Sequence, residues 1–249
     1  MRMRRLIIAA VLAALGVAAV LATAMAGTGP FSWQGYTWCP TAGTGSGCNA
    51  VYSHTAFGNG DLADFYPAQV SVDRSGYLHL AMNSTGTESG AVTSQTQETF
   101  TVPFTLSSKI ELACSGGLLD NWPAFWLTSG SLANGEIDVV EGLHGVPRWT
   151  YHYTNAQGTV TSQTGSLPGF TGCGTFIYKV VATTSSITWY FGGTKAGEVA
   201  TSCSAPCISI GVPISTSPMN LLWDYANGST EGGPGVNSVN MQVQSLVKG

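Results

Sequence analysis

The sequence predicts an all-β protein that folds as a sandwich or jelly roll. Short runs of alternating apolar and polar residues recur along the chain, and clusters of Gly, Ser and Thr separate them. Helical periodicity is absent outside the first 26 residues. We find no internal repeat and no long linker, so residues 27–249 are expected to form one domain with a sizeable core.

The first 26 residues predict a signal peptide. Arg2, Arg4 and Arg5 precede an apolar run over residues 6–25, and Ala24-Met25-Ala26 is a small-x-small cleavage signal. The apolar run is long enough that an uncleaved membrane anchor is the alternative. We expect cleavage, and therefore a secreted, extracellular protein with no stable membrane association once the leader is removed.

The charge balance excludes several classes of partner. Removal of the three leader arginines leaves six Lys and Arg residues against 13 acidic ones, so the formal net charge is −7. Such a chain has no basic patch for nucleic acid or for an anionic membrane. A sulfated polysaccharide would also need several cations. A neutral glycan is the easier ligand.

Six cysteines, all beyond the leader, are typical of an oxidising compartment. Their spacing suggests the pairs Cys39–Cys48, Cys203–Cys207 and Cys114–Cys173, although cysteine count alone allows other pairings. Zinc is the weaker alternative, because the chain has no C-x-x-C pair and its four histidines are scattered. We therefore predict disulfides and no metal ligands.

The strands are expected in order along the chain, each bounded by turn residues. The predicted strands cover residues 77–82, 100–112, 122–127, 136–141, 149–153, 187–191, 218–228 and 239–247. In the strand over residues 122–127, alternation places Trp122, Ala124 and Trp126 on one face. A tryptophan face offers a sugar ring a flat apolar platform, while packing in the core is the alternative.

One strand, Gly135-Glu136-Ile137-Asp138-Val139-Val140-Glu141, holds three of the 13 acidic residues. In a regular strand, Glu136 and Asp138 share one face and Glu141 points to the other. A β-bulge at Val139-Val140 would return Glu141 to the face of its partners. The spacing E-x-D-x-x-E thus predicts three carboxylates on one face of a bulged strand.

Three carboxylates on one face suit glycoside hydrolysis. A retaining glycosidase needs two carboxyl groups about 5–5.5 Å apart, one as nucleophile and one as acid/base. Between Glu136 and Glu141, Asp138 is expected to separate the pKa values of the two glutamates, so that one is ionised and the other protonated. The alternative is a solvated edge strand that carries acids, which would serve folding poorly because like charges repel.

The acidic strand resembles the signature of glycoside hydrolase family 16, in the bulged form of its laminarinase-like members. The upstream stretch Asn121-Trp122-Pro123-Ala124-Phe125-Trp126-Leu127 resembles that family's W-P-A-x-W-L strand, and a weaker resemblance extends over most of the chain after about residue 57. The resemblance implies a concanavalin-like β-jelly-roll sandwich of two antiparallel sheets. It also implies that Glu136 is the nucleophile, Glu141 the general acid/base and Asp138 an assisting group.

The same resemblance suggests substrate-binding residues. We expect Trp126 nearest the substrate, Trp122 packed beneath it, and Trp223, in the family's late inner strand, at the border of the cleft. His152 matches a histidine that faces the carboxylates, with a satisfied sheet histidine as the alternative. Asn59 lies in a segment that loosely resembles the family's G-N-x-x-L contact.

The predicted function is that of a secreted, endo-acting, retaining glycoside hydrolase of a neutral β-glucan, with β-1,3 or mixed β-1,3/1,4 linkages. The alternatives are a transglycosylase or galactan hydrolase on the same fold, and a non-catalytic β-glucan-binding lectin. We expect a monomer that needs no cofactor. A structural calcium ion on the convex side is a family feature, but no cluster of oxygen ligands in the sequence requires it.

Overall fold

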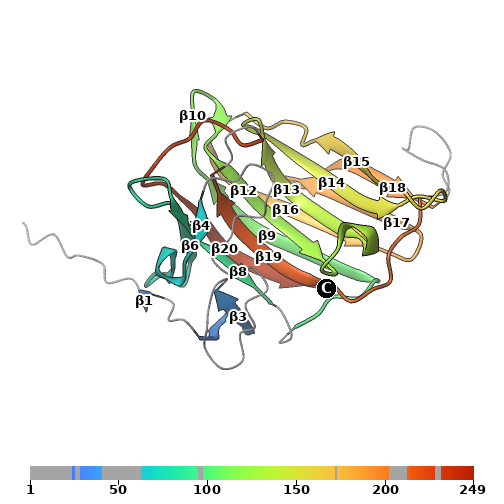
Figure 1. Ribbon diagram of the computed structural model, residues 1–249, viewed down its shortest axis with the longest axis horizontal. Helices are drawn as coiled ribbons and strands as arrows, with labels where there is room; N and C mark the ends of the chain where they lie inside the picture. The colour runs from blue at the N-terminus through green and yellow to red at the C-terminus, as the bar shows by residue number, and fades with distance from the viewer. Residues whose placement is uncertain are drawn as a thin grey trace, which may run out of the picture.

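The computed structural model describes residues 24–25, 29–40, 63–94, 98–171, 173–201, 212–227 and 231–249. Two eight-stranded antiparallel sheets lie one over the other (Figure 1). The first, which we call the front sheet, has the order β15 (Val160–Ser166), β14 (Val146–Thr154), β13 (Glu136–Leu143), β12 (Trp122–Thr128), β19 (Asn220–Ala226), β8 (Ala91–Thr93), β3 (Tyr36–Pro40) and β2 (Phe31–Trp33).

The second sheet, which we call the back sheet, completes the sandwich. Its order is β1 (Ala24–Met25), β5 (Val70–Val72), β6 (Leu78–Ala81), β20 (Asn240–Lys248), β9 (Phe104–Leu112), β16 (Gly174–Ala182), β17 (Ser186–Phe191) and β18 (Thr194–Ala200). Smaller elements lie between the strands of the two sheets along the chain: the hairpin β10 (Cys114–Ser115) and β11 (Leu118–Leu119), the parallel pair β4 (Asp64–Phe65) and β7 (Glu88–Ser89), and the 3-10 helices η1 (Pro67–Gln69) and η3 (Leu132–Asn134). The prediction of an all-β sandwich of two antiparallel sheets is confirmed.

The core between the sheets is built from the inward positions of alternating strands. Phe125 of β12 stacks on Trp223 of β19, with ring centroids 5.2 Å apart and an interplanar angle of 18°. Trp149 of β14 stacks on Trp189 of β17, from the opposite sheet, at 4.5 Å and 22°. All four rings are buried. The contact between Trp149 and Trp189 joins the two sheets, and burial of all four rings contributes apolar area that stabilises the fold.

Trp149 also explains two glycines at the edges of the sandwich. A Cβ atom at Gly165 of β15 or at Gly197 of β18 would overlap the indole ring of Trp149. Neither glycine has a positive φ, so the requirement is space and not backbone conformation. The glycines therefore let one large ring fill the space where an edge strand of each sheet approaches the other.

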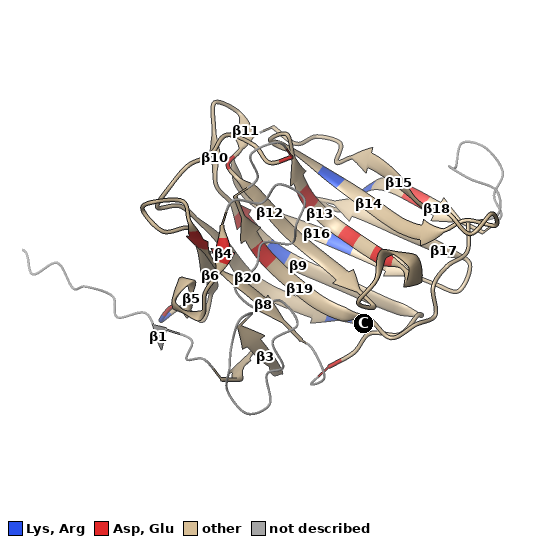
Figure 2. Cartoon of the chain, viewed as in Figure 1, with Lys and Arg blue, Asp and Glu red and all other residues tan. Residues whose placement is uncertain are grey.

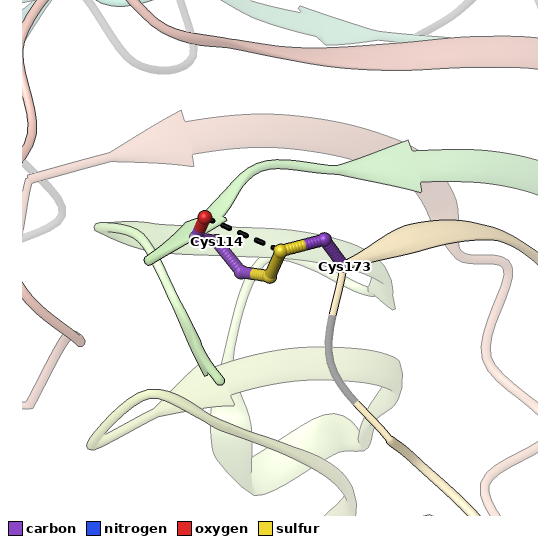
Figure 3. Close-up of a disulfide and its surroundings, with 2 residues drawn as sticks. All are labelled: Cys114 and Cys173. Atoms are coloured by element: carbon purple, nitrogen blue, oxygen red, sulfur yellow. Dashed lines mark hydrogen bonds between the residues drawn. A yellow bond between two sulfur atoms is a disulfide. The ribbon is translucent and has the colours of Figure 1, made fainter. Parts of the chain in front are cut away.

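The predicted disulfide between Cys114 and Cys173 is present (Figure 3). It joins the segment after β9 to the segment before β16, with the two Cα atoms 5.2 Å apart. Since β9 and β16 are hydrogen-bonded neighbours, the bond reinforces an existing pairing. The pairs Cys39–Cys48 and Cys203–Cys207 stay predictions, because Cys48, Cys203 and Cys207 lie outside the described residues.

Most of the predicted signal peptide lies outside the described residues. The described part of it, β1, pairs with β5 at the edge of the back sheet. Within the described ranges, no helix has both the length and the apolar character needed to cross a membrane.

Candidate active site

The bulge predicted in the acidic strand is present in β13. On β12, Trp126 pairs with Asp138 and its neighbour Phe125 pairs with Val140. Two consecutive residues of β12 thus face three consecutive residues of β13, so β13 carries one extra residue. The register with β14 shifts in the same place. Ile137, Val139 and Val140 all pack in the core. The extra residue thus lies within Val139-Val140 and restores Glu141 to the outward face.

We call this outward side of the front sheet the carboxylate face. Register lines up its side chains in rows across the strands, since residues directly opposite in a sheet share a face. One row pairs Thr128, Glu136 and His152, and the adjacent row pairs Trp126, Asp138 and Thr150. Figure 2 shows the acidic positions of β13 in red on a strand flanked on both sides by neighbours. The solvated edge strand considered above is therefore wrong.

Burial raises the pKa of all three carboxyl groups. The pKa of Glu136 is raised to about 8, chiefly by burial and then by the charge of Asp138. Burial and the charge of Asp138 likewise raise the pKa of Glu141 to about 8. Burial alone raises the pKa of Asp138. Burial acts similarly at both glutamates and raises both pKa values to about 8, so the expected separation of the two stays a prediction.

His152 lies beside two of the carboxylates. Its Nε2 atom is 3.5 Å from Asp138 Oδ2 and 3.9 Å from Glu136 Oε1. The positive charge that His152 carries when protonated lowers the pKa of both glutamates and opposes the effect of burial. Thr128 adds a hydrogen bond to Glu136 that acts in the same direction. The structure places His152 with the acids; its contact with substrate stays a prediction.

Two indole rings of β12 hold acidic side chains on the carboxylate face. Trp122 Nε1 donates to Glu141 Oε1 at 3.0 Å, and Trp126 Nε1 donates to Asp224 Oδ2 at 2.6 Å. Trp126 is only 8% exposed, whereas Trp122 is half-buried. The expected packing of Trp122 beneath Trp126 is therefore wrong, whereas the nearness of Trp126 to substrate stays a prediction. Trp122 is the more accessible ring, and it is hydrogen-bonded to Glu141, the predicted acid/base.

Trp223 does not border the carboxylate face, contrary to prediction. It is fully buried in the sandwich core, in contact with Trp33, Trp38 and Phe125. Trp223 and Tyr225 do lie on one face of β19, as predicted, but that face points into the core. Asn59 lies outside the described residues, so its proposed contact stays a prediction.

The outward phase of β19 contributes a residue that the sequence analysis missed. Asp224 is 3% exposed and lies across from Ala124, which in turn lies across from Glu141. The signal was available, since Asp224 is the one charged residue of that strand and a charge normally marks the face away from the core. Glu231, outside the strands, also raises the pKa of Glu141 by its charge.

Glu136, Asp138 and His152 form a second kind of site. One donor atom from each lies within 4.8 Å of the other two, a spacing that could hold a metal ion. Cysteine and histidine spacing along the sequence predicts no metal ligands, because such spacing does not show residues that two neighbouring strands bring together.

No protein-family model matches the sequence, and no curated protein matches it. Solved structures do. The endo-β-1,3-glucanase from Pyrococcus furiosus superposes with a TM-score of 0.60 at 19% identity, over 88% of this chain and 97% of that one. A glycoside hydrolase family 16 endo-glucanase from Bacteroides ovatus gives 0.63 at 18% identity, over 85% and 94%. The laminarinase from Rhodothermus marinus gives 0.61 at 20%, over 78% and 86%. The chain therefore has the jelly-roll fold of the family 16 endo-glucanases and laminarinases.

Proposed function

We propose that the protein is a secreted, endo-acting, retaining glycoside hydrolase of family 16 that cleaves a neutral β-glucan. One observation carries the proposal: the bulge in β13 brings Glu136, Asp138 and Glu141 together on the outward face of the front sheet. A fold built only for stability gains nothing from three mutually repelling acids, whereas glycoside hydrolysis needs such a group.

In the proposed mechanism, Glu136 attacks the anomeric carbon while Glu141 protonates the departing glycosidic oxygen. The bond to the leaving sugar breaks as the bond to Glu136 forms, which gives a covalent glycosyl-enzyme. Glu141, now ionised, removes a proton from water, and the water releases the sugar from Glu136 with net retention. Asp138 lies between the two and raises the pKa of both by its charge, which helps Glu141 to stay protonated at neutral pH.

The proposed substrate is a β-1,3-glucan or a mixed β-1,3/1,4-glucan. The support is the bulged motif, the scarcity of basic residues and the likeness in fold to an endo-β-1,3-glucanase, laminarinases and a mixed-linkage endo-glucanase. The half-buried ring of Trp122, beside Glu141, offers a platform for a sugar next to the scissile bond.

The test is sugar release from laminarin, lichenan and agarose by the protein and by its Glu136→Gln variant. We expect release from laminarin or lichenan, and a loss of at least about 10³-fold in the variant, since removal of a nucleophile leaves only positioning and binding effects. Glu111→Gln is the matched control, because Glu111 is exposed on the back sheet. Binding without release by the unaltered protein would favour a lectin, and release only from agarose would favour a galactan hydrolase.

The stereochemistry and the location of the protein can be checked separately. Proton NMR of the first products should show the β-anomer if the configuration is retained. Oligosaccharides longer than the substrate would instead indicate a transglycosylase. N-terminal sequencing of the exported protein should begin at Gly27, and sedimentation should give a monomer; retention of the leader in the membrane fraction would contradict secretion.

A further inference from the structure

Glu136, Asp138 and His152 meet the geometric requirements of a metal site. The donor atoms of the three residues lie within 4.8 Å of one another. His152 Nε2 is 3.5 Å from Asp138 Oδ2 and 3.9 Å from Glu136 Oε1. In a tetrahedral zinc site with bonds of about 2.0–2.1 Å, neighbouring ligand atoms are about 3.3 Å apart. The spacing of 3.5 Å exceeds that value by about 0.2 Å and the spacing of 3.9 Å exceeds it by about 0.6 Å, so small side-chain movements would close both.

A second observation points to a ligand at the same place. Asp138 is 5% exposed, and its Oδ2 atom, which faces His152, has no hydrogen-bond partner among the described residues. A buried polar atom without a partner is costly, so its acceptor capacity is available to a ligand that enters the site. In the described part of the chain, His152 is also the sole ion-pair partner of Glu136 and Asp138. The site therefore has negative charge that a cation can neutralise.

The donor set selects the class of metal. One imidazole nitrogen and two carboxylate oxygens suit zinc and similar divalent transition metals. Calcium and magnesium prefer sites made of oxygen alone, with more ligands than this set provides. Three protein ligands also leave one tetrahedral position for water.

We propose that Glu136, Asp138 and His152 bind one zinc-class divalent ion, and that this ion inhibits the enzyme. The inhibitory part rests on the proposed function, because a metal bonded to Glu136 takes the electron pair that attacks the sugar. Binding of the ion itself does not depend on activity. Free divalent metal and glucan would then compete for the same carboxylate.

The chain provides its own controls. His79 pairs with Asp73 at 3.0 Å, and His144 lies 3.6 Å from Glu231. Among the described residues, each of these two histidines has a single acidic partner, whereas His152 has two. If one histidine and one carboxylate were enough to bind the metal, then His79, His144 and His152 would all bind it. We expect metal binding at His152 alone of these three histidines.

The binding test is calorimetric titration of the purified protein with Zn²⁺, followed by Co²⁺ as a spectroscopic probe. We expect one ion per chain and a visible Co²⁺ spectrum of low coordination number. His152→Gln and Asp138→Asn should each weaken binding by at least about tenfold, since each removes a ligand. His79→Gln and His144→Gln should change it less than about twofold. Circular dichroism checks the fold of each variant. If either His152→Gln or Asp138→Asn fails to fold, the other still tests the site.

The inhibition test uses the unaltered protein and its preferred glucan. We expect Zn²⁺ to raise KM more than it lowers kcat, and a chelator to restore the rate. Stoichiometric binding that is unaffected by His152→Gln, or equal losses in His79→Gln, would overturn the site. Binding without any sugar release would contradict the proposed function and leave the site standing. Sugar release that zinc at saturating concentration does not slow would overturn the inhibitory role.

Discussion

The indole nitrogen of Trp189 donates a hydrogen bond to the backbone carbonyl of Asp138 at 2.9 Å. Trp189 belongs to β17 of the back sheet, so the bond crosses the core of the sandwich. It reaches β13 immediately before the inserted residue, where a bulge interrupts the ladder and leaves backbone groups without their regular partners. The back sheet thus supports the geometry of the carboxylate face from behind.

Replacement of Trp189 by Phe should therefore destabilise the protein more than the same change at a comparable ring. Trp223 is as deeply buried, and its Nε1 atom has no hydrogen-bond partner in the described ranges. Both changes remove similar volume, but only Trp189→Phe leaves a buried carbonyl without its donor. We expect the free energy of unfolding, measured with urea, to fall by about 1–3 kcal/mol more for Trp189→Phe than for Trp223→Phe. Equal losses would show that the bond is dispensable.

The raised pKa values predict an activity optimum well above pH 5. One glutamate must be ionised and the other protonated, and the pKa of both is raised to about 8. Activity should rise with pH toward a maximum between about 7 and 8 and fall above it. Asp138→Asn removes a charge that raises both values, so its optimum should move down by about one pH unit. Profiles of kcat/KM against pH, recorded with a chelator present, check this. An unchanged optimum would contradict a role for that charge.

The same shifts predict that stability decreases as the pH rises. A carboxyl group with a raised pKa in the folded state binds more protons there than in the unfolded chain. The contribution of such a group to the free energy of unfolding is complete below its unfolded-state pKa of about 4.5. That contribution is lost as the pH rises through its folded-state pKa of about 8. Glu136→Gln removes one such group. Relative to the unaltered protein, the variant should gain at least about 1 kcal/mol between pH 5 and pH 8. Urea titrations at both values measure the difference; a constant difference would contradict it.

Loss of the bond from Trp122 to Glu141 should impair turnover. Trp122→Phe keeps an aromatic ring but removes the donor at 3.0 Å, which orients Glu141 and lowers its pKa. We expect kcat/KM to fall about tenfold and the basic limb of the pH profile to move upward. Trp33→Phe is the control, since Trp33 Nε1 donates to Gly76 O, away from the acids. A higher KM with unchanged kcat would instead identify Trp122 as a sugar platform only.

The disulfide between Cys114 and Cys173 should contribute to stability and not to chemistry. The two cysteines are 59 residues apart, so the bond restricts the unfolded chain considerably. Replacement of both by Ser should lower the free energy of unfolding by about 4 kcal/mol. The rate per folded molecule should stay within about twofold, because neither sulfur touches the carboxylate face. Urea midpoints and specific activity measured together test this, and a stable but inactive variant would contradict it.

The sequence predicted the sandwich and the bulge well, because both follow from local patterns. Alternation along residues 136–141 fixed which positions are apolar, and the only way to place Glu141 beside its partners was one extra residue. The Trp122-Ala124-Trp126 face follows from period two in the same way. These features need no knowledge of distant segments.

The errors concern relations between segments. Alternation alone gave two phases for β19, and only the charge of Asp224 could have indicated that Asp224 faces the acids while Trp223 faces the opposite sheet. The similar pKa values of the two glutamates depend on how deeply each is buried, which neighbouring strands decide. The contact between Trp189 and Asp138 joins residues 51 positions apart on different sheets, and no local pattern reports it.

The inserted residue in β13 has a consequence for how far the spacing of the three acids can vary. Deletion of either Val139 or Val140 would leave every acid in the chain and would keep the strand apolar on its inner side. The strand would then read E-x-D-x-E, and a regular strand without a bulge presents all three of those acids on one face. Two chain lengths can thus give the same row of carboxylates, provided that the extra residue and the bulge that absorbs it are lost together.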